Sequence, residues 1–176
     1  MKLRFLSYRF AEEVLEGRVL RPSAQEAFAI LQRLPVIPVG ATPGKKAKKK
    51  RFTVDQEAMN KWLDVEFKKA GWQYHPRIIE GTKLEGDYRK DRIQLEVQFG
   101  NMARWTYDVL KFQICYSQDL IDVGVLVVPT RAFAALIGEN IVQWERVCRE
   151  LPHAKLSITL PIMVVGLDPT ERREGA

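Results

Sequence analysis

The stretch that most constrains the fold of this chain is residues 85–100, EGDYRKDRIQLEVQFG. From position 92 to position 99 apolar and polar residues alternate, the apolar set being Ile93, Leu95, Val97 and Phe99 and the polar set Gln94, Glu96 and Gln98. Alternation with a period of two predicts a half-buried strand. We expect the apolar face to pack on the core and the polar face to carry chemistry.

This strand is the second strand of a hairpin if the chain turns near Asp91 and Arg92. That turn would place Asp87, nine residues before Glu96, roughly opposite Glu96 across two strands. Two carboxylates so close repel each other unless a proton or a cation lies between them, and Mg²⁺ suits ligands that are all oxygen. The pattern therefore predicts a metal site, and the plainer interpretation is a solvated turn with an apolar inner face.

Asp87, Glu96 and Gln98 together resemble the PD-(D/E)XK nuclease motif, with Gln98 where most members carry a catalytic Lys. The run DYRKDRIQLEVQFG and the later IDVGV, residues 121–125, are similar to the BglII/BstYI group of type II restriction endonucleases. The resemblance extends from the lysine-rich segment to VVGLDP at residues 164–169 and is closest over residues 87–128. It implies Mg²⁺-dependent cleavage of double-stranded DNA at a short palindrome with a GATC core.

The resemblance also implies roles for individual residues. Asp87 and Glu96 would coordinate Mg²⁺, the carbonyl of Val97 would complete the inner sphere, and Gln98 would position water or the scissile phosphate. His75 lies near the place where the BglII side of the group carries a polar residue beside the attacking water. It could orient or deprotonate that water, and the alternative is a surface or structural histidine.

Gln98 supplies an amide donor and acceptor but no charge. Stabilisation of the charge on the phosphate should therefore depend on the metal and on Lys or Arg side chains that face the phosphate. Lys90 and Arg92 are candidates for this role, and a surface role at the turn of the hairpin is the alternative for both.

A second charged feature is the run KKAKKKR at residues 45–51, which follows a segment broken by proline and glycine. We interpret residues 40–51 as a flexible basic loop. Six positive charges in seven residues repel one another unless they meet counter-charges such as phosphates. We expect the loop to contact DNA through Lys45, Lys46, Lys48, Lys49 and Lys50, and the alternative is a solvated segment.

Two short loops are candidates for reading DNA bases. Asn101 follows the strand of Glu96, and Gly138, Glu139 and Asn140 separate two predicted helices. Asparagine can bind adenine bidentately in the major groove. Either asparagine could instead cap a helix. The resemblance favours Asn140, because the matching loop faces the major groove just before an aromatic residue and a Glu, here Trp144 and Glu145.

The remaining pattern predicts an α/β fold. We expect a strand or short helix at 2–10, helical residues at 11–16, a helix capped by Ser23 and Glu26 that ends before Pro35, and a helix capped by Thr53 and Gln56 that ends at Gly71. We also expect a helix whose apolar stripe holds Trp105, Val109, Phe112 and Tyr116 and whose polar side holds Lys111 and Gln113. A buried strand should follow at 123–128, then helices at 131–137 and 141–150 and a strand at 157–165. Residues 171–176 should be frayed. The resemblance specifies a restriction-endonuclease-like core, in which helices flank a mixed β-sheet.

The length of 176 residues suits one domain, 1–176, with a sizeable core. No apolar run is long enough to cross a bilayer and no signal peptide is evident, so we expect a cytoplasmic protein without a membrane partner. Cys115 and Cys148 show no spacing typical of zinc or disulfide sites and should be core thiols. Cutting both strands of a palindrome is simplest for a two-fold symmetric homodimer.

Three other functions stay open from the sequence. One is a PD-(D/E)XK repair or structure-specific nuclease, and another is a DNA-binding module that has lost cleavage. The third is a basic protein that binds RNA or the ribosome, which predicts exposed stacking aromatics and no carboxylate pair. A net charge of +6 is compatible with all of them.

Overall fold

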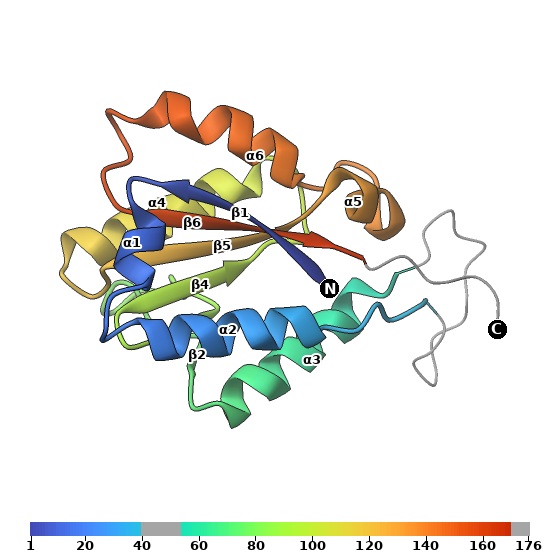
Figure 1. Ribbon diagram of the computed structural model, residues 1–176, viewed down its shortest axis with the longest axis horizontal. Helices are drawn as coiled ribbons and strands as arrows, with labels where there is room; N and C mark the ends of the chain where they lie inside the picture. The colour runs from blue at the N-terminus through green and yellow to red at the C-terminus, as the bar shows by residue number, and fades with distance from the viewer. Residues whose placement is uncertain (40–53, 170–176) are drawn as a thin grey trace.

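The structure is a computed structural model that describes residues 1–39 and 54–169 of the chain (Figure 1). The predicted basic loop, Thr53 of the predicted cap and the C-terminal tail lie outside the described residues. The described chain forms one six-stranded sheet in the order β1-β6-β5-β4-β3-β2. Its strands are β1 (Lys2–Tyr8), β2 (Gln73–Tyr74), β3 (Tyr88–Lys90), β4 (Ile93–Val97), β5 (Val123–Pro129) and β6 (Ile162–Asp168).

The sheet is mixed, as the resemblance implied. Strands β4, β5 and β6 are parallel, while β1 runs antiparallel to β6 and both β2 and β3 continue the sheet antiparallel beyond β4. The helices are α1 (Ala11–Leu15), α2 (Arg21–Arg33), α3 (Gln56–Lys69), α4 (Arg104–Ser117), α5 (Arg131–Ile137), α6 (Trp144–Glu150) and the 3₁₀ helix η1 (Leu151–Ala154). None of the helices in the described part of the chain is long and apolar enough to cross a membrane.

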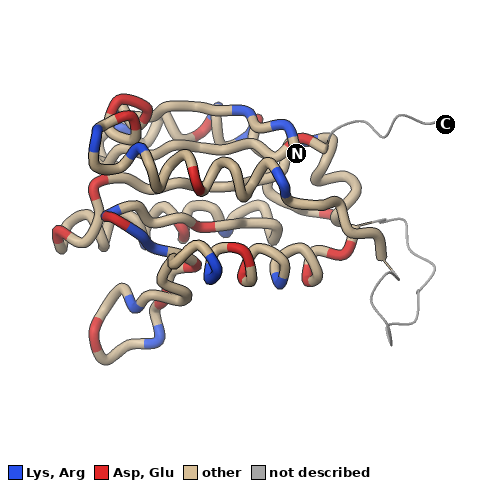
Figure 2. The backbone as a smooth tube through the Cα atoms, turned by 60° about the horizontal axis from the view of Figure 1, so that its bottom comes forward, with Lys and Arg blue, Asp and Glu red and all other residues tan. Residues whose placement is uncertain are grey.

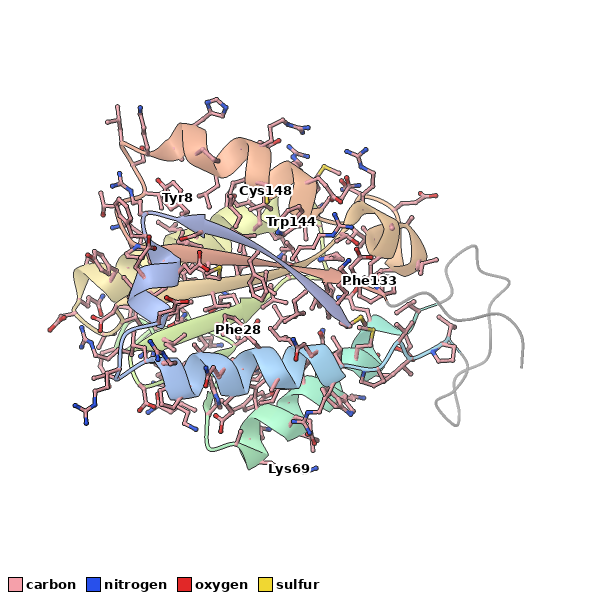
Figure 3. All side chains as sticks on the ribbon, in the orientation of Figure 1. Tyr8, Phe28, Lys69, Phe133, Trp144 and Cys148 are labelled. Atoms are coloured by element: carbon pink, nitrogen blue, oxygen red, sulfur yellow. The ribbon has the colours of Figure 1, made fainter. Side chains whose placement is uncertain are left out.

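The centre of the sheet is β5, whose seven residues are all buried. Its unbroken apolar run is typical of a strand covered on both faces, so the prediction for this strand is confirmed. Val125 and Val127 join a core with α2, α3 and Phe133 of α5, whereas Leu126 and Val128 join a second core with α4 and α6. In Figure 1 α2 and α3 lie on one side of the sheet and α6 on the other, and Figure 3 labels Phe133 and Trp144 between the layers.

Helix α4 packs very close to the sheet at one point. A Cβ atom added to Gly124 of β5 would lie 2.6 Å from the Phe112 ring of α4, so only glycine fits there. The buried stripe of α4 includes Trp105, Val109 and Phe112, as predicted, but the fourth position is Cys115. Tyr116, predicted for that position, is 38% exposed. Lys111, predicted for the polar side, is instead largely buried against Glu96 of β4.

Both predicted capping boxes are wrong. Helix α2 begins at Arg21, so Ser23 lies inside it, and the Ser23 hydroxyl donates to Asp91 at 2.6 Å. Helix α3 is capped by Asp55, whose carboxylate accepts from the backbone N–H of Ala58 at 3.1 Å. The predicted end of α3 is confirmed, because Gly71 adopts φ +78° directly after Ala70.

Two later elements begin after their predicted positions. Ile141 pairs with Asn101 in an isolated β-bridge, so α6 starts only at Trp144. Strand β6 starts at Ile162, after Pro161, and residues 157–160 are not a strand. The predicted strand or helix at the N-terminus is the strand β1, and the helix predicted at 131–137 is confirmed as α5.

Candidate active site

The hairpin of β3 and β4 positions the two predicted carboxylates. Asp91 and Arg92 form its two-residue turn and both have positive φ, 47° and 68°. Turns of this kind match the twist of paired strands and fix the register. Tyr88 pairs with Leu95, which places Asp87 next to Glu96 as predicted, and the Asp87 backbone N–H donates to Glu96 Oε1 at 3.2 Å.

The turn is held by partners distant in sequence. The Arg92 guanidinium binds the carboxylates of Asp122 and Asp119, at 2.8 and 2.5 Å. Lys90 donates to Glu26 and to the carbonyl of Ala70, both at 2.7 Å. Lys90 and Arg92 therefore bind other residues of the chain. This agrees with the alternative interpretation, a surface role at the turn of the hairpin, rather than with contact to the phosphate.

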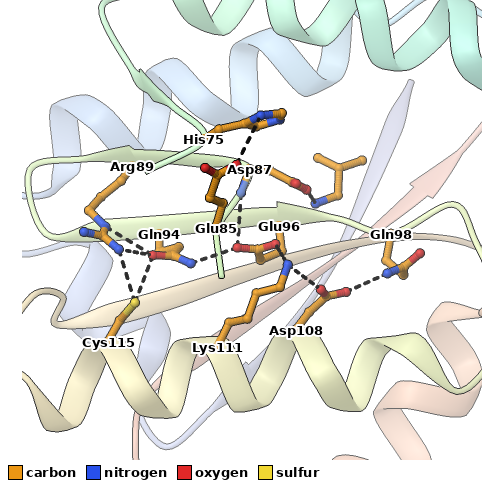
Figure 4. Close-up of polar contacts among 11 residues, drawn as sticks. His75, Glu85, Asp87, Arg89, Gln94, Glu96, Gln98, Asp108, Lys111 and Cys115 are labelled. Atoms are coloured by element: carbon orange, nitrogen blue, oxygen red, sulfur yellow. Dashed lines mark hydrogen bonds and ion pairs between the residues drawn. The ribbon is translucent and has the colours of Figure 1, made fainter. Parts of the chain in front are cut away.

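The polar face of β4 is buried, contrary to the prediction of a half-buried strand. Gln94 and Glu96 are both 0% exposed because α4 covers them. Glu96 Oε1 accepts from Gln94 Nε2 at 2.8 Å, and Glu96 Oε2 accepts from Lys111 Nζ at 2.6 Å (Figure 4). Asp87 Oδ2 accepts from the backbone N–H of Val97 at 2.8 Å, and no described residue donates to Asp87 Oδ1.

Lys111 and Asp108, both on α4, extend this network toward Gln98. Lys111 Nζ lies 3.0 Å from Asp108 Oδ1, and Asp108 Oδ2 accepts from Gln98 Nε2 at 2.8 Å (Figure 4). Gln98 Oε1 accepts from the backbone N–H of Gly100 at 2.8 Å. Both ends of the Gln98 amide are therefore used within the protein.

The other end of the network is made of neutral and cationic groups. Gln94 Oε1 accepts from Arg89 Nη2 at 2.7 Å, and Cys115 Sγ lies 3.2 Å from the same oxygen. Cys115 is buried, as predicted, and burial raises its pKa. Gln94 thereby holds Glu96 in a single orientation.

Sequence reasoning missed Lys111 and Asp108 as members of the site. Asp108 is buried, and it falls on the same helical stripe as Trp105, Phe112 and Cys115. A carboxylate within an apolar stripe needs a partner, and that was the available signal. The Lys three residues later supplies the partner.

The charges at this site favour a bound cation. Burial is the main cause that raises the pKa of both Asp87 and Glu96, and for Glu96 the neighbouring Asp87 adds to it. Burial alone would lower the pKa of Lys111, but Glu96 and Asp108 outweigh it and hold that pKa above its usual value. Three carboxylates thus share one ammonium group, so the cluster carries excess negative charge.

The two carboxylates fit a hard divalent ion that takes its remaining ligands from backbone, water or substrate oxygens. Within residues 1–39 and 54–169 no group of three or more His, Cys, Asp or Glu side chains forms a complete metal cage. Asp87 and Glu96 would therefore need backbone, water or substrate oxygens to complete a coordination shell. The structure directs the Val97 N–H at Asp87, and the role predicted for the Val97 carbonyl stays a prediction.

A cleft of about 280 Å³ opens over Asp87. It is lined by His75, Lys83, Leu84, Glu85, Gly86, Asp87, Arg104, Tyr107 and Lys111. A larger hollow of about 530 Å³ lies between β1, α1 and α2, but none of the site residues lines it. We assign the chemistry to the smaller cleft, because Asp87 lines it and Glu96 lies buried next to Asp87.

His75 lies at the rim of this cleft, close to the position that sequence predicted. Its backbone N–H donates to the Asp87 carbonyl at 3.0 Å, and its ring stacks on Tyr74 at 3.8 Å between centroids. His75 Nδ1 is 3.8 Å from Glu85 Oε2. The imidazole is half exposed, so it can meet a ligand in the cleft.

The two predicted base-reading loops lie side by side just beyond the carboxyl end of β4. Asn101 forms an isolated bridge with Ile141, and the Met102 N–H donates to the Asn140 carbonyl at 2.8 Å. The Asn101 side chain accepts from the Ala103 N–H at 2.9 Å, just before α4. Asn140 has φ +57° and caps no helix, since Gln143 precedes α6. Gly138 and Glu139 complete this loop.

The comparisons with known proteins agree with this geometry. The family described as "Restriction endonuclease BglII/BglIII" matches residues 3–167 of the chain. A crystal structure of restriction endonuclease BglII complexed with a DNA 16-mer is similar with a TM-score of 0.81 and 18% identity, over 98% of this chain and 79% of that one. Free BglII is similar with a TM-score of 0.71 and 18% identity, over 97% and 81%. No curated protein matches the sequence.

Proposed function

Because the chain belongs to the BglII/BglIII restriction endonuclease family, we propose that it is a Mg²⁺-dependent type II enzyme that cuts double-stranded DNA at a short palindrome. The observation that carries this proposal is the pair Asp87 and Glu96, which the hairpin brings together at one end of the sheet. The expected core of the palindrome is GATC, on the resemblance to the BglII/BstYI group. We propose a cytoplasmic location, because an enzyme that cuts DNA must meet it inside the cell.

Asp87 and Glu96 would hold Mg²⁺ together with the carbonyl of Val97. The bound ion would lower the pKa of a water molecule and offset charge on the phosphate oxygens. Gln98 fixes the end of β4 by bonding both Asp108 and Gly100, which orients the strand that carries Glu96. His75 at the rim of the cleft is placed to orient or accept a proton from the attacking water.

The residues that attract DNA differ from the residues that would cut it. Six of the 28 Lys and Arg residues lie between Lys45 and Arg51, and the other 22 are balanced by 22 Asp and Glu. Figure 2 shows charges of both signs spread along the described backbone. We therefore assign most of the sequence-independent attraction for phosphate to Lys45, Lys46, Lys48, Lys49 and Lys50.

A homodimer completes the proposal. The described chain holds one paired set of Asp87 and Glu96, which can act on one strand at a time. A two-fold symmetric pair of chains would meet both strands of a palindrome, with the loop of Asn140 reading bases and Asn101 holding the start of α4 beside it.

The decisive experiment is a digest of several DNAs of known sequence with Mg²⁺, with Ca²⁺ and with EDTA. Discrete bands with Mg²⁺ alone, which vanish for Glu96→Ala while DNA binding stays within about tenfold, are the expected result. Cleavage only at branched or damaged DNA would instead indicate a repair nuclease. Binding without cleavage under every condition would indicate a DNA-binding module that has lost catalysis.

A further inference from the structure

One requirement of phosphodiester cleavage is not met by the residues of the motif. Gln98 stands where a lysine would supply positive charge, and its amide carries none. Gln98 is also held in place, because one N–H of its Nε2 donates to Asp108 and its Oε1 accepts from Gly100. The remaining amide N–H is neutral, so Gln98 can supply no positive charge to a phosphate oxygen.

Helix α4 places a cation beside the carboxylates from the opposite direction. Lys111 Nζ lies 2.6 Å from Glu96 Oε2 and 3.0 Å from Asp108 Oδ1. An ammonium group has three N–H donors, and these two carboxylates use two of them. The described residues offer the third donor no hydrogen-bond acceptor.

The surroundings of Lys111 connect it to the cleft. Its side chain is only 12% exposed, and it lines the 280 Å³ cleft together with Asp87. The Tyr107 ring on the same wall has its centroid 5.8 Å from Lys111 Nζ. Lys83 and Arg104 also line this cleft, but neither bonds Asp87 or Glu96 in the described chain, so Lys111 is the lysine or arginine of this cleft that bonds the carboxylate pair.

We propose that Lys111 is the catalytic cation of this enzyme and contacts a non-bridging oxygen of the scissile phosphate, a role that Gln98 does not fill. This proposal rests on the nuclease function proposed above. In the reaction a water oxygen forms a bond to phosphorus, the bond from phosphorus to the leaving sugar oxygen breaks, and that oxygen takes up a proton from solvent. The proton of the attacking water passes to solvent, directly or by way of His75, and Lys111 keeps all its protons.

Asp108 is a positioning residue in this arrangement. Its two oxygens bind Lys111 and Gln98, so it joins the ammonium group of α4 to the end of β4. The alternative is that Lys111 only neutralises Glu96 and Asp108. That role would also make the lysine necessary for folding, so a test needs a measurement that folding alone does not change.

The first test compares Lys111→Gln with a matched control. Lys69 of α3 also lies three residues after its acidic partner, Glu66, but its side chain is 68% exposed and points away from the sheet (Figure 3). With saturating enzyme and Mg²⁺, we expect Lys111→Gln to slow single-turnover cleavage about 10²- to 10³-fold, as when one transition-state donor is removed. Lys69→Gln should cleave at the wild-type rate. A Lys111→Gln rate equal to wild type overturns the proposal.

The second test moves the charge to the position of the motif. Gln98→Lys combined with Lys111→Gln should cleave at least about tenfold faster than Lys111→Gln alone, because the cation is restored from the other side of the site. This comparison also decides the case in which Lys111→Gln fails to fold. A folded double variant that cleaves no faster than Glu96→Ala overturns the proposal.

The third test reads binding rather than cleavage. Once the wild-type digest has located the cut bond, a neutral methylphosphonate replaces the scissile phosphate and DNA affinity is measured in EDTA. The wild type should lose affinity, and Lys111→Gln should lose at least about fivefold less. Equal losses overturn the contact. If the wild type cuts no DNA at all, the proposed function fails first, which separates the two failures.

Discussion

A Cβ atom added to Gly86 would lie 2.7 Å from Glu96 Oε1 and 2.4 Å from Gln94 Nε2. The backbone before Asp87 therefore passes directly against the buried carboxylate. Any side chain at position 86 must displace the hydrogen bond between Gln94 and Glu96.

Gly86→Ala should consequently impair cleavage although every proposed catalytic group is still present. We expect the rate to fall about 100-fold, because a shift of about 1 Å in a catalytic group can have that effect. Gly71→Ala is the control, since its φ of +78° makes alanine strained while no atom lies within 4 Å. The control should lose stability, by about 1 kcal/mol, and keep its cleavage rate. Wild-type cleavage by Gly86→Ala would contradict the close approach.

Asp87→Asn should stabilise the protein in EDTA at pH 8. Burial raises the pKa of Asp87 above its usual value near 3.8, so the fold favours the protonated form and the charged form lowers stability. Asparagine keeps an acceptor for the Val97 N–H and removes the charge.

The pH dependence of this gain has a fixed sign. Below the unfolded pKa the carboxyl is neutral in both states, so the advantage of Asp87→Asn should shrink as pH falls from 8 toward 4. Mg²⁺ should raise the Tm of the wild type more than that of the variant. Thermal melts from pH 4 to 8 measure both effects, and a lower Tm for Asp87→Asn at pH 8 would contradict the charge argument.

Asn140→Gly should separate base reading from backbone conformation. Glycine adopts the φ of +57° found at Asn140 without strain, while the amide is removed. We expect the variant to lose discrimination against sites with one altered base pair, by about 1–3 kcal/mol, with little change in Tm. Cleavage competition between cognate and altered sites is the measurement, and retained discrimination would place the reading loop elsewhere.

Asn101→Ala should give the opposite result. Its side chain accepts from the Ala103 N–H at 2.9 Å, so its removal should lower stability by about 1 kcal/mol. The same competition assay should show unchanged discrimination, unlike that of Asn140→Gly.

Replacing the five lysines between positions 45 and 50 by alanine should weaken specific and non-specific DNA binding alike. The log–log dependence of affinity on salt should flatten by roughly 0.9 for each phosphate that the protein no longer neutralises. An unchanged slope would mean that these lysines are only solvated.

Local patterns in the sequence were sufficient to predict the hairpin of β3 and β4 and the central strand β5. Asp91 and Arg92 mark the turn, and the apolar run of β5 has no competing interpretation. The parallel order of β4, β5 and β6 and the antiparallel edges agree with the fold that the resemblance implied.

The errors have a common physical cause in contacts between distant parts of the chain. Ser23 and Glu26 match a capping box, yet Ser23 binds Asp91, while Glu26 accepts from Trp72 and Lys90. Local sequence does not show such partners.

The position of Lys111 was predicted wrongly for the same reason. It lies at the edge of the apolar stripe of α4, where a lysine usually reaches solvent. Only the packing of α4 over β4 shows that Glu96 is opposite, and that packing depends on Gly124 admitting Phe112.

The pairing of β1 with β6 has a consequence for the order in which the molecule assembles during synthesis. Lys2 pairs with Asp168, so β1 cannot pair until β6 has been made. Closing so long a loop is slow, whereas the hairpin of β3 and β4 needs only neighbouring residues. A nascent chain that pauses before Ile162 therefore carries an unpaired β1 and an open edge on β5. Such edges can pair with other chains, so the arrival of β6 between β1 and β5 is the step that protects the protein from aggregation.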